Sequence, residues 1–106
     1  MIKVIPAVVT SNTKFVVKNS AYTFVVGDRI FADMTASAWT ITLPASAVAG
    51  DSVELMTYGT YALTVGRNSH KIANVSDDGL ITGGTNAHFK FTYLNSTYGW
   101  TYGDAL

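Results

Sequence analysis

The strongest constraint on the fold of this chain is an alternation of apolar and polar residues that repeats at every second position. In the segment WTITL, Trp39, Ile41 and Leu43 alternate with two threonines. Because successive side chains of a β-strand point to opposite faces, this pattern predicts a strand with one buried face. Six further segments show the same alternation, and their expected inward residues are Tyr22, Phe24 and Val26; Ile30, Ala32 and Met34; Val53 and Leu55; Leu63 and Val65; Phe89, Phe91 and Tyr93; and Tyr98, Trp100 and Tyr102.

Turn-forming residues separate these segments at intervals of roughly ten residues, as in a sandwich, roll or small barrel. The breaks contain Gly27-Asp28, Pro44 to Asp51, Tyr58-Gly59, Asn68-Ser69, Asp77 to Gly79, Gly83 to Asn86 and Asn95-Ser96. No segment has the apolar spacing of an amphipathic helix. We therefore predict an all-β protein, a single small antiparallel β-sandwich, roll or barrel, in which the last two segments form a hairpin.

The first twenty residues differ from the rest of the chain. Pro6 interrupts the strand pattern, and the polar run from Thr10 to Thr13 interrupts it again before Phe15. Proline is confined to strand edges because it cannot donate a backbone hydrogen bond. The sequence thus predicts an N-terminal arm or edge strand over residues 1–20 and one antiparallel β domain over residues 21–106. An arm could add to the sheet of a neighbouring molecule, whereas an edge strand would belong to its own domain.

The composition limits the classes of partner. Apolar residues make up 48% of the 106-residue chain and charged residues only 13%, with seven Lys and Arg balancing seven Asp and Glu. A protein that binds nucleic acid needs an excess of positive charge, so nucleic acid is a poor candidate. The apolar runs are too short to span a bilayer, and we expect no membrane partner. Low, balanced charge permits close association with other subunits or with copies of the same chain.

No motif in the sequence predicts catalysis, a metal site or a bound cofactor. His70 and His88 lie eighteen residues apart, outside any metal-ligand spacing, and we interpret them as a loop residue and a strand residue. The Asp77-Asp78-Gly79 segment lacks the spaced oxygens and the closing Glu of a calcium loop and predicts a turn. No serine lies in a Gly-x-Ser-x-Gly motif. We therefore expect a binding or assembly protein that is not an enzyme.

Candidate contact residues come from the two ends of the chain. At the start of the chain, the candidates are Ile2, Val4, Pro6 and Val8 of the expected arm. At the other end, Tyr93, Tyr98, Trp100 and Tyr102 could form a core, a subunit contact or a stacking surface for a ligand, since Tyr and Trp are favoured at interfaces. The sequence leaves these alternatives open.

Three segments together resemble a module of phage tail fibres and other virion proteins. They are GDRIFADMTASAWTITLPASAVAGDSVEL, LTVGRNSHKI and FKFTYLNSTYGW, and they extend from about Tyr22 to Trp100, about three-quarters of the chain. In that module a Gly-Asp pair opens a strand, a T-x-T-L-P-A segment follows, a second Gly-Asp opens the next strand, and an aromatic strand ends at Gly-Trp. The matching positions are Gly27-Asp28, Thr40 to Ala45, Gly50-Asp51, Leu63 to Asn68 and Gly99-Trp100.

This resemblance implies a rigid β unit used in symmetric virion assemblies. The chain departs from the fibre pattern because it carries no coiled-coil or collagen-like shaft. The resemblance therefore favours a capsid decoration (cement) protein that bridges capsid subunits, with a short tail-fibre or tail adaptor module as the alternative. The implied partners are capsid subunits or tail proteins of one virion and further copies of the chain, with a trimer favoured. The implied location is the virion, on the capsid surface rather than the tail, after synthesis in the host cytoplasm.

Overall fold

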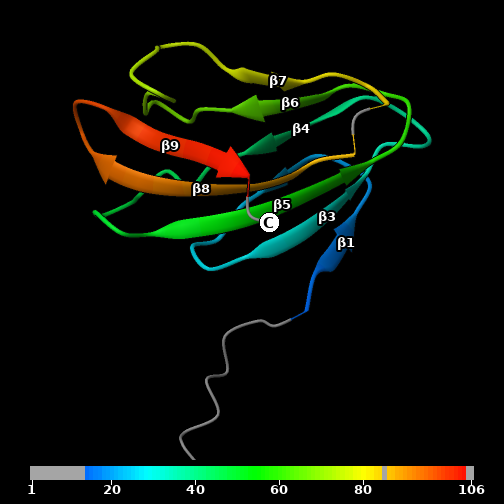
Figure 1. Cartoon of the computed structure of the whole chain (residues 1–106), viewed down its shortest axis with the longest axis horizontal. Coiled ribbons are helices and arrows are strands. Elements are labelled where there is room, and N and C mark those ends of the chain that lie inside the picture. The colour runs from blue at the N-terminus through cyan, green and yellow to red at the C-terminus, as the bar shows by residue number, and fades with distance from the viewer. Residues whose placement is uncertain (1–13, 85, 105–106) are drawn as a thin grey trace, which may run out of the picture.

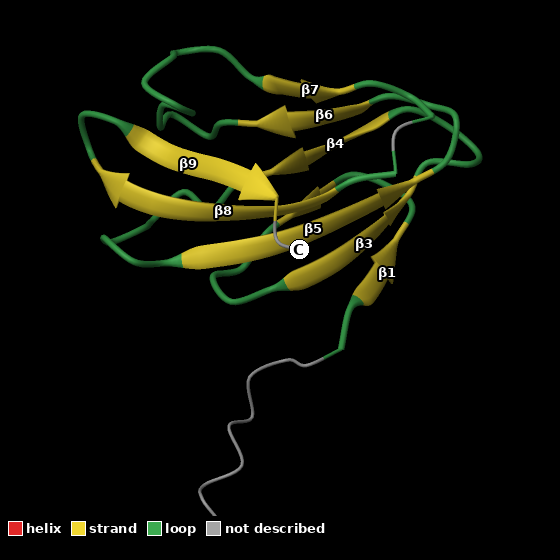
Figure 2. Cartoon of the chain, viewed as in Figure 1, coloured by secondary structure: helices red, strands yellow, loops and turns green. Residues whose placement is uncertain are grey.

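The computed structural model describes residues 14–84 and 86–104, which form nine β-strands and contain no helix (Figures 1 and 2). The strands are β1 (Val16–Lys18), β2 (Tyr22–Thr23), β3 (Arg29–Asp33), β4 (Trp39–Thr42), β5 (Ser52–Tyr58), β6 (Leu63–Gly66), β7 (Gly79–Ile81), β8 (His88–Asn95) and β9 (Gly99–Asp104). Within this part of the chain, then, no long apolar helix is available to cross a membrane.

The strands form two sheets that pack face to face, so the expected all-β fold is confirmed. One sheet has the order β1-β3-β5-β8-β9 and the other has the order β2-β4-β6-β7. From β1 to β6 the chain passes to the opposite sheet after every strand, and each pair of strands lies beside the previous pair (Figure 1). Two edges of the sandwich result, one formed by β1 and β2 and the other by β9 and β7.

Strand direction differs in part from the antiparallel arrangement expected from the sequence. The pairs β5–β8, β8–β9 and β6–β7 are antiparallel, and β8–β9 is the expected hairpin. In contrast, β1, β3 and β5 pair in parallel, as do β2, β4 and β6. Consecutive strands of one sheet run parallel here because the chain returns between them through a strand of the other sheet. A strand with one buried face has period two in either direction, so the alternation predicted the strands but not their direction.

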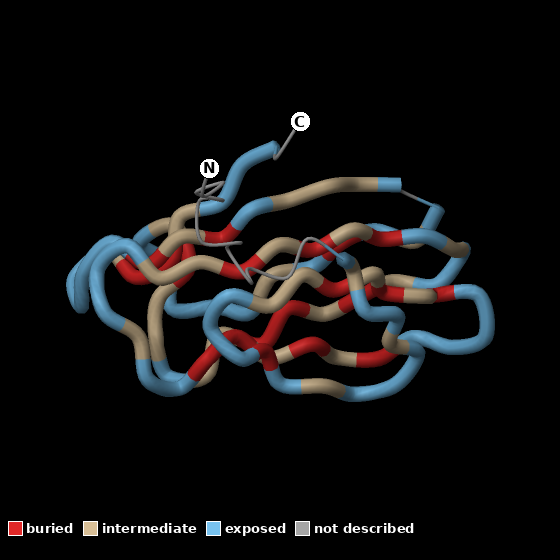
Figure 3. The backbone as a smooth tube through the Cα atoms, turned by 90° about the horizontal axis from the view of Figure 1, so that it is seen from below, coloured by how far each residue is buried: buried red, intermediate tan, exposed pale blue. Residues whose placement is uncertain are grey.

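The core lies between the two sheets, where buried and partly exposed residues alternate along the strands (Figure 3). Most of the expected inward residues are there, including Ile41, Leu55 and Leu63, which are fully buried. Val26 is an exception: it is exposed because Gly27, at φ 91°, turns the chain directly after it. The largest fully buried side chain is Trp100.

The predicted N-terminal region lies partly within the described residues. Residues 16–18 form β1, which pairs in parallel with β3 and is an edge strand of the chain's own sheet. The arm residues Ile2, Val4, Pro6 and Val8 lie outside the described residues. The edge-strand interpretation therefore applies to β1, and the arm interpretation remains a prediction for the residues that precede it.

Candidate functional site

Two turns with the same geometry stand at one end of the sandwich, before β3 and before β5. In each, a glycine with positive φ precedes an aspartate: Gly27 has φ 91° and Gly50 has φ 95°. The Asp28 carboxylate accepts a hydrogen bond from the backbone N–H of Val25 at 2.8 Å, and the Asp51 carboxylate accepts one from Val48 at 3.0 Å. Each Gly-Asp pair is therefore a structural turn, in which the aspartate fixes the backbone three residues earlier.

These turns lie next to one another and next to the end of β8. The Gly27 N–H donates to the Ser52 carbonyl at 2.8 Å, and the Gly50 N–H donates to the Tyr93 carbonyl at 2.9 Å. Figure 1 shows the loops before β3 and β5 and the β8–β9 turn gathered at the same end of the molecule. The two turns lie beside one another because the strands that follow them, β3 and β5, are neighbours in the same sheet.

The stacked turns carry a group of exposed apolar side chains, which we call the turn-end patch: Val25, Val26, Val48 and Leu94. Val25 is 63% exposed and Val48 is 68% exposed, at equivalent places in the two turns. The nearby Asp28 and Asp51 carboxylates are engaged by backbone N–H groups. Exposed apolar side chains that gather on one surface make that surface a candidate for contact with another macromolecule.

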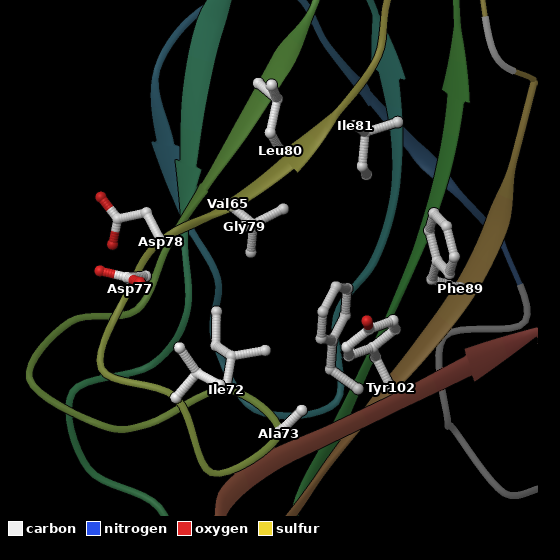
Figure 4. Close-up of a pocket in the computed structure, with 12 residues that line it drawn as sticks. Val65, Ile72, Ala73, Asp77, Asp78, Gly79, Leu80, Ile81, Phe89 and Tyr102 are labelled. Atoms are coloured by element: carbon white, nitrogen blue, oxygen red, sulfur yellow. The ribbon is translucent and has the colours of Figure 1, made fainter.

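A second apolar feature, the edge pocket, opens between the two sheets where β7 faces β8 and β9. It has a volume of about 250 Å³. Its walls are β7, the turn at Ile72–Val75, and the rings of Phe89, Phe91 and Tyr102, with Asp77 and Asp78 at the rim (Figure 4). Leu80, which is 68% exposed, and Tyr102, which is 57% exposed, leave the entrance apolar.

The Ile72–Val75 wall is held rigidly against β9. Ile72 and Val75 exchange two backbone hydrogen bonds across Ala73 and Asn74, which both have positive φ. The Ala73 N–H also donates to the carbonyl of Trp100 at 2.7 Å. A wall tied in this way can receive an apolar group without rearranging the backbone, which lowers the entropy cost of binding.

The two aspartates at the rim of the pocket have different surroundings. Asp78 Oδ1 accepts a hydrogen bond from the backbone N–H of Arg67 at 2.9 Å, as a turn residue does. Among the described residues, no hydrogen bond or ion pair engages the Asp77 carboxylate, and both residues are exposed. The described residues contain no group of three His, Asp or Glu side chains that could hold a metal ion.

The aromatic residues near the C-terminus divide between the core and the surface. Trp100 and Tyr93 are buried and their rings meet edge to face, with centroids 5.3 Å apart. Tyr98 is half-buried and Tyr102 is exposed beside the edge pocket. The core is therefore the location of Tyr93 and Trp100, and only Tyr98 and Tyr102 of the four candidates offer substantial surface to a partner.

A polar cluster joins three strands on the outer face of the larger sheet. Glu54 Oε2 accepts hydrogen bonds from His88 Nε2 at 3.0 Å and from Arg29 Nη2 at 3.4 Å. The Phe15 ring lies over this cluster, with its centroid 4.3 Å from the Arg29 guanidinium carbon and 5.5 Å from the His88 ring centroid. Burial raises the pKa of Glu54, but the His88 hydrogen bond and the Arg29 charge outweigh it and hold that pKa below its usual value.

His88 thus lies on a strand, as the sequence predicted. His70 lies in a loop, also as predicted, and contacts other residues. His70 Nε2 lies 2.7 Å from the Ala45 carbonyl oxygen, and its ring meets the edge of Tyr93. Neither the edge pocket nor the turn-end patch was predicted from the sequence. Exposed Val25, Val48 and Leu80 carry no pattern that separates them from core residues, because a turn or edge position decides their exposure.

A scan against protein-family models and a search of curated proteins find no match to this chain.

Proposed function

We propose that this chain is a structural protein of a bacteriophage virion, a capsid decoration protein that stabilises the shell by bridging capsid subunits. The observation that carries the proposal is the turn-end patch, where two hydrogen-bonded turns expose valines at equivalent places at one end of the β unit. Such a face binds a partner by burying apolar surface, and binding of this kind needs no catalytic residue. We therefore propose a role in assembly rather than in catalysis.

The residues that resemble virion modules support this proposal through their roles in the fold. Gly27-Asp28 and Gly50-Asp51 build the turns that position the patch, and Trp100 fills the centre of the core. The motifs thus specify a framework, and the contact surface is displayed on that framework. A module that is used in many copies needs a rigid framework of this kind, because each copy must present the same surface.

The proposed mechanism is the burial of apolar surface across the joints between capsid subunits. A stable contact buries about 1,200–2,000 Å² in total, more than the four side chains of the patch supply alone. Flanking polar residues such as Ser52 and Asn95 would form the rim around an apolar centre. Low net charge on the chain leaves little electrostatic repulsion between copies that bind close together.

The alternative is a short tail-fibre or tail adaptor module that binds host glycan or another tail protein. One surface favours it: at the end of β5 opposite the turn-end patch, the Phe31 and Tyr58 rings stack with centroids 6.4 Å apart. Tyr58 and nearby Tyr61 are both about half exposed. Exposed aromatic rings of this kind pack against sugar rings, because a flat apolar face with a polar edge suits them.

Particles of the phage that encodes this chain provide the test. Imaging at subnanometre detail, with a labelled antibody against the chain, should place it at repeated positions on the capsid surface. Added protein should also co-sediment with shells that lack it. Val25→Asp and Val48→Asp should weaken that binding at least tenfold, whereas Val17→Asp, on strand β1 and as exposed as Val25, should have little effect. Label at the tail would support the alternative, and absence from particles would reject both.

A further inference from the structure

We propose that the edge pocket binds residues Ile2–Val9 of a second copy of this chain, with apolar side chains in the pocket and Lys3 beside Asp77 and Asp78. The contact deepens the assembly role proposed above and rests on it. The two partners are complementary in size, in polarity and in charge.

The volume of the pocket fits side chains better than a whole small molecule. Sites for drug-sized ligands and cofactors are about 300–1,000 Å³, whereas this pocket is about 250 Å³. Its walls are aliphatic and aromatic, and they are open to solvent at Leu80 and Tyr102. An extended segment meets this requirement when it places an apolar side chain at every second position, as Ile2, Val4, Pro6 and Val8 do in the sequence.

Charge complementarity selects this segment in particular. Asp77 and Asp78 lie at one end of the pocket, with their carboxylates directed outward, and the aromatic rings lie at the other end (Figure 4). Residues 2–9 contain one charged side chain, Lys3, near the start of the apolar run. With Lys3 beside the aspartates, the following apolar residues extend toward Phe89 and Tyr102. The exposed Asp77 has no partner among the described residues, so it is available to the lysine.

The positions of the two elements favour a second copy over the same copy. The strand that follows the segment, β1, is at one edge of the five-stranded sheet, and β8 and β9 of the pocket are at the other. Four strand spacings separate these edges, about 19 Å. Between β1 and the pocket of the same copy lies the outer face of the sheet, where the Phe15 ring packs over Arg29 and beside His88.

Binding from one edge to the opposite edge of the next molecule is a head-to-tail contact. Such contacts close into rings when the rotation between neighbours permits it. The trimer favoured from the sequence would be a ring of three such contacts. The four polar residues Thr10 to Thr13 provide a link of about 13 Å between the bound segment and β1.

The first test measures the self-association of the full chain by light scattering over a range of concentrations. Lys3→Glu and Asp77→Lys should each weaken association about tenfold, and the double variant should recover most of the affinity because it restores the ion pair with reversed sign. Leu80→Asp should weaken association further. Lys14→Glu, a charge reversal outside the segment, is the control and should leave association unchanged. A chain that is monomeric at all concentrations, or association that none of these variants affects, would overturn the proposal.

The second test identifies whose pocket is occupied. The chain has no cysteine, so Lys3→Cys gives one site for a spin label. Spin-labelled copies are mixed with isotope-labelled copies that carry no spin label, and the amide signals of the isotope-labelled copies are recorded. Broadening at Leu80, Ile81 and Phe89 in those copies is expected. A control sample carries the spin label and the isotopes in the same copy. If the signals broaden in that sample but not in the mixture, the segment binds its own pocket and the second-copy proposal is overturned.

These tests are separate from the localisation of the chain in particles. If the chain is absent from virions but the charge exchange restores association, the virion function fails and the contact between copies stands. If the chain decorates shells but associates without dependence on Lys3 and Asp77, the contact fails and the function stands.

Discussion

The backbone of Gly99 lies so close to the carbonyl oxygen of Lys71 that a Cβ atom at position 99 would overlap it. The same carbonyl accepts a hydrogen bond from the Trp100 N–H at 2.8 Å, so the approach is part of the pairing between β9 and the connection from β6 to β7, where Ile72 is bridged to Trp100. Gly99 also has φ 82°, in the left-handed region. Position 99 therefore requires glycine for two independent reasons, the close approach of the Lys71 carbonyl and the positive φ.

We expect Gly99→Ala to destabilise the protein by at least about 3 kcal/mol, because backbone strain and steric overlap add at this position. Urea unfolding would measure the loss. Gly84→Ala is the matched control: Gly84 also has φ 82°, but a Cβ there would meet nothing within 4 Å. It should cost about 1 kcal/mol, the strain alone. Equal losses for the two variants would contradict the close contact with Lys71.

Trp100→Ala should destabilise the fold by about 3–5 kcal/mol, since the side chain is 0% exposed and its removal leaves a large cavity. Trp100→Phe should cost much less. Among the described residues the Trp100 Nε1 has no hydrogen-bond partner, so phenylalanine removes a buried polar group together with part of the ring. Denaturant unfolding of both variants checks this. A small loss for Trp100→Ala combined with defective assembly would instead place the tryptophan in an interface.

The sequence predicted the strands well because period two is a direct consequence of one buried face. Ile30 and Ile41 illustrate this, since each lies where the alternation placed it. Strand direction was not predictable in the same way, because a half-buried strand has the same pattern in parallel and antiparallel pairs. The switch of sheets after each strand from β1 to β6 depends on long-range packing, which no local pattern encodes.

The surfaces were harder to predict than the core. Val26 continues the alternation of Tyr22 and Phe24, yet the turn at Gly27 leaves it exposed. Leu80 is a residue type that is usually found in the core, but it belongs to a three-residue edge strand and is exposed. In both cases the position of the residue in the fold decides its exposure, so the turn-end patch and the edge pocket emerge only when the strands are arranged in space.

Tyr22 provides a prediction for alkaline pH. Its hydroxyl donates to Asp28 Oδ2 at 2.7 Å, and this hydrogen bond, together with burial and the Asp28 charge, raises the pKa of Tyr22 to about 12. The folded-state pKa is above the ordinary value of about 10, so the stabilising contribution is complete below that value and is lost as the pH rises through 12. Denaturant unfolding between these limits should show a steeper loss of stability for the native chain than for Tyr22→Phe.

An ultraviolet titration of phenolate formation checks the assignment. The native chain should show a late component of phenolate formation near pH 12, and Tyr22→Phe should lack it. If the late ionisation persisted in the variant, a different tyrosine would be responsible. At neutral pH the variant should lose about 1 kcal/mol, the net contribution of the hydrogen bond.

Glu54 provides the corresponding prediction for acid. Its folded-state pKa is held below the usual value, since the His88 hydrogen bond and the Arg29 charge outweigh the opposing effect of burial. The contribution of Glu54 to stability is therefore complete above the unfolded-state pKa of about 4.3 and is lost as the pH falls through the lower folded-state value. Glu54→Gln should be less stable than the native chain at neutral pH and should lose less stability on acidification. Asp104→Asn removes an exposed carboxylate elsewhere and controls for the change in net charge. Identical acid profiles for Glu54→Gln and the native chain would exclude a stabilising role for the cluster.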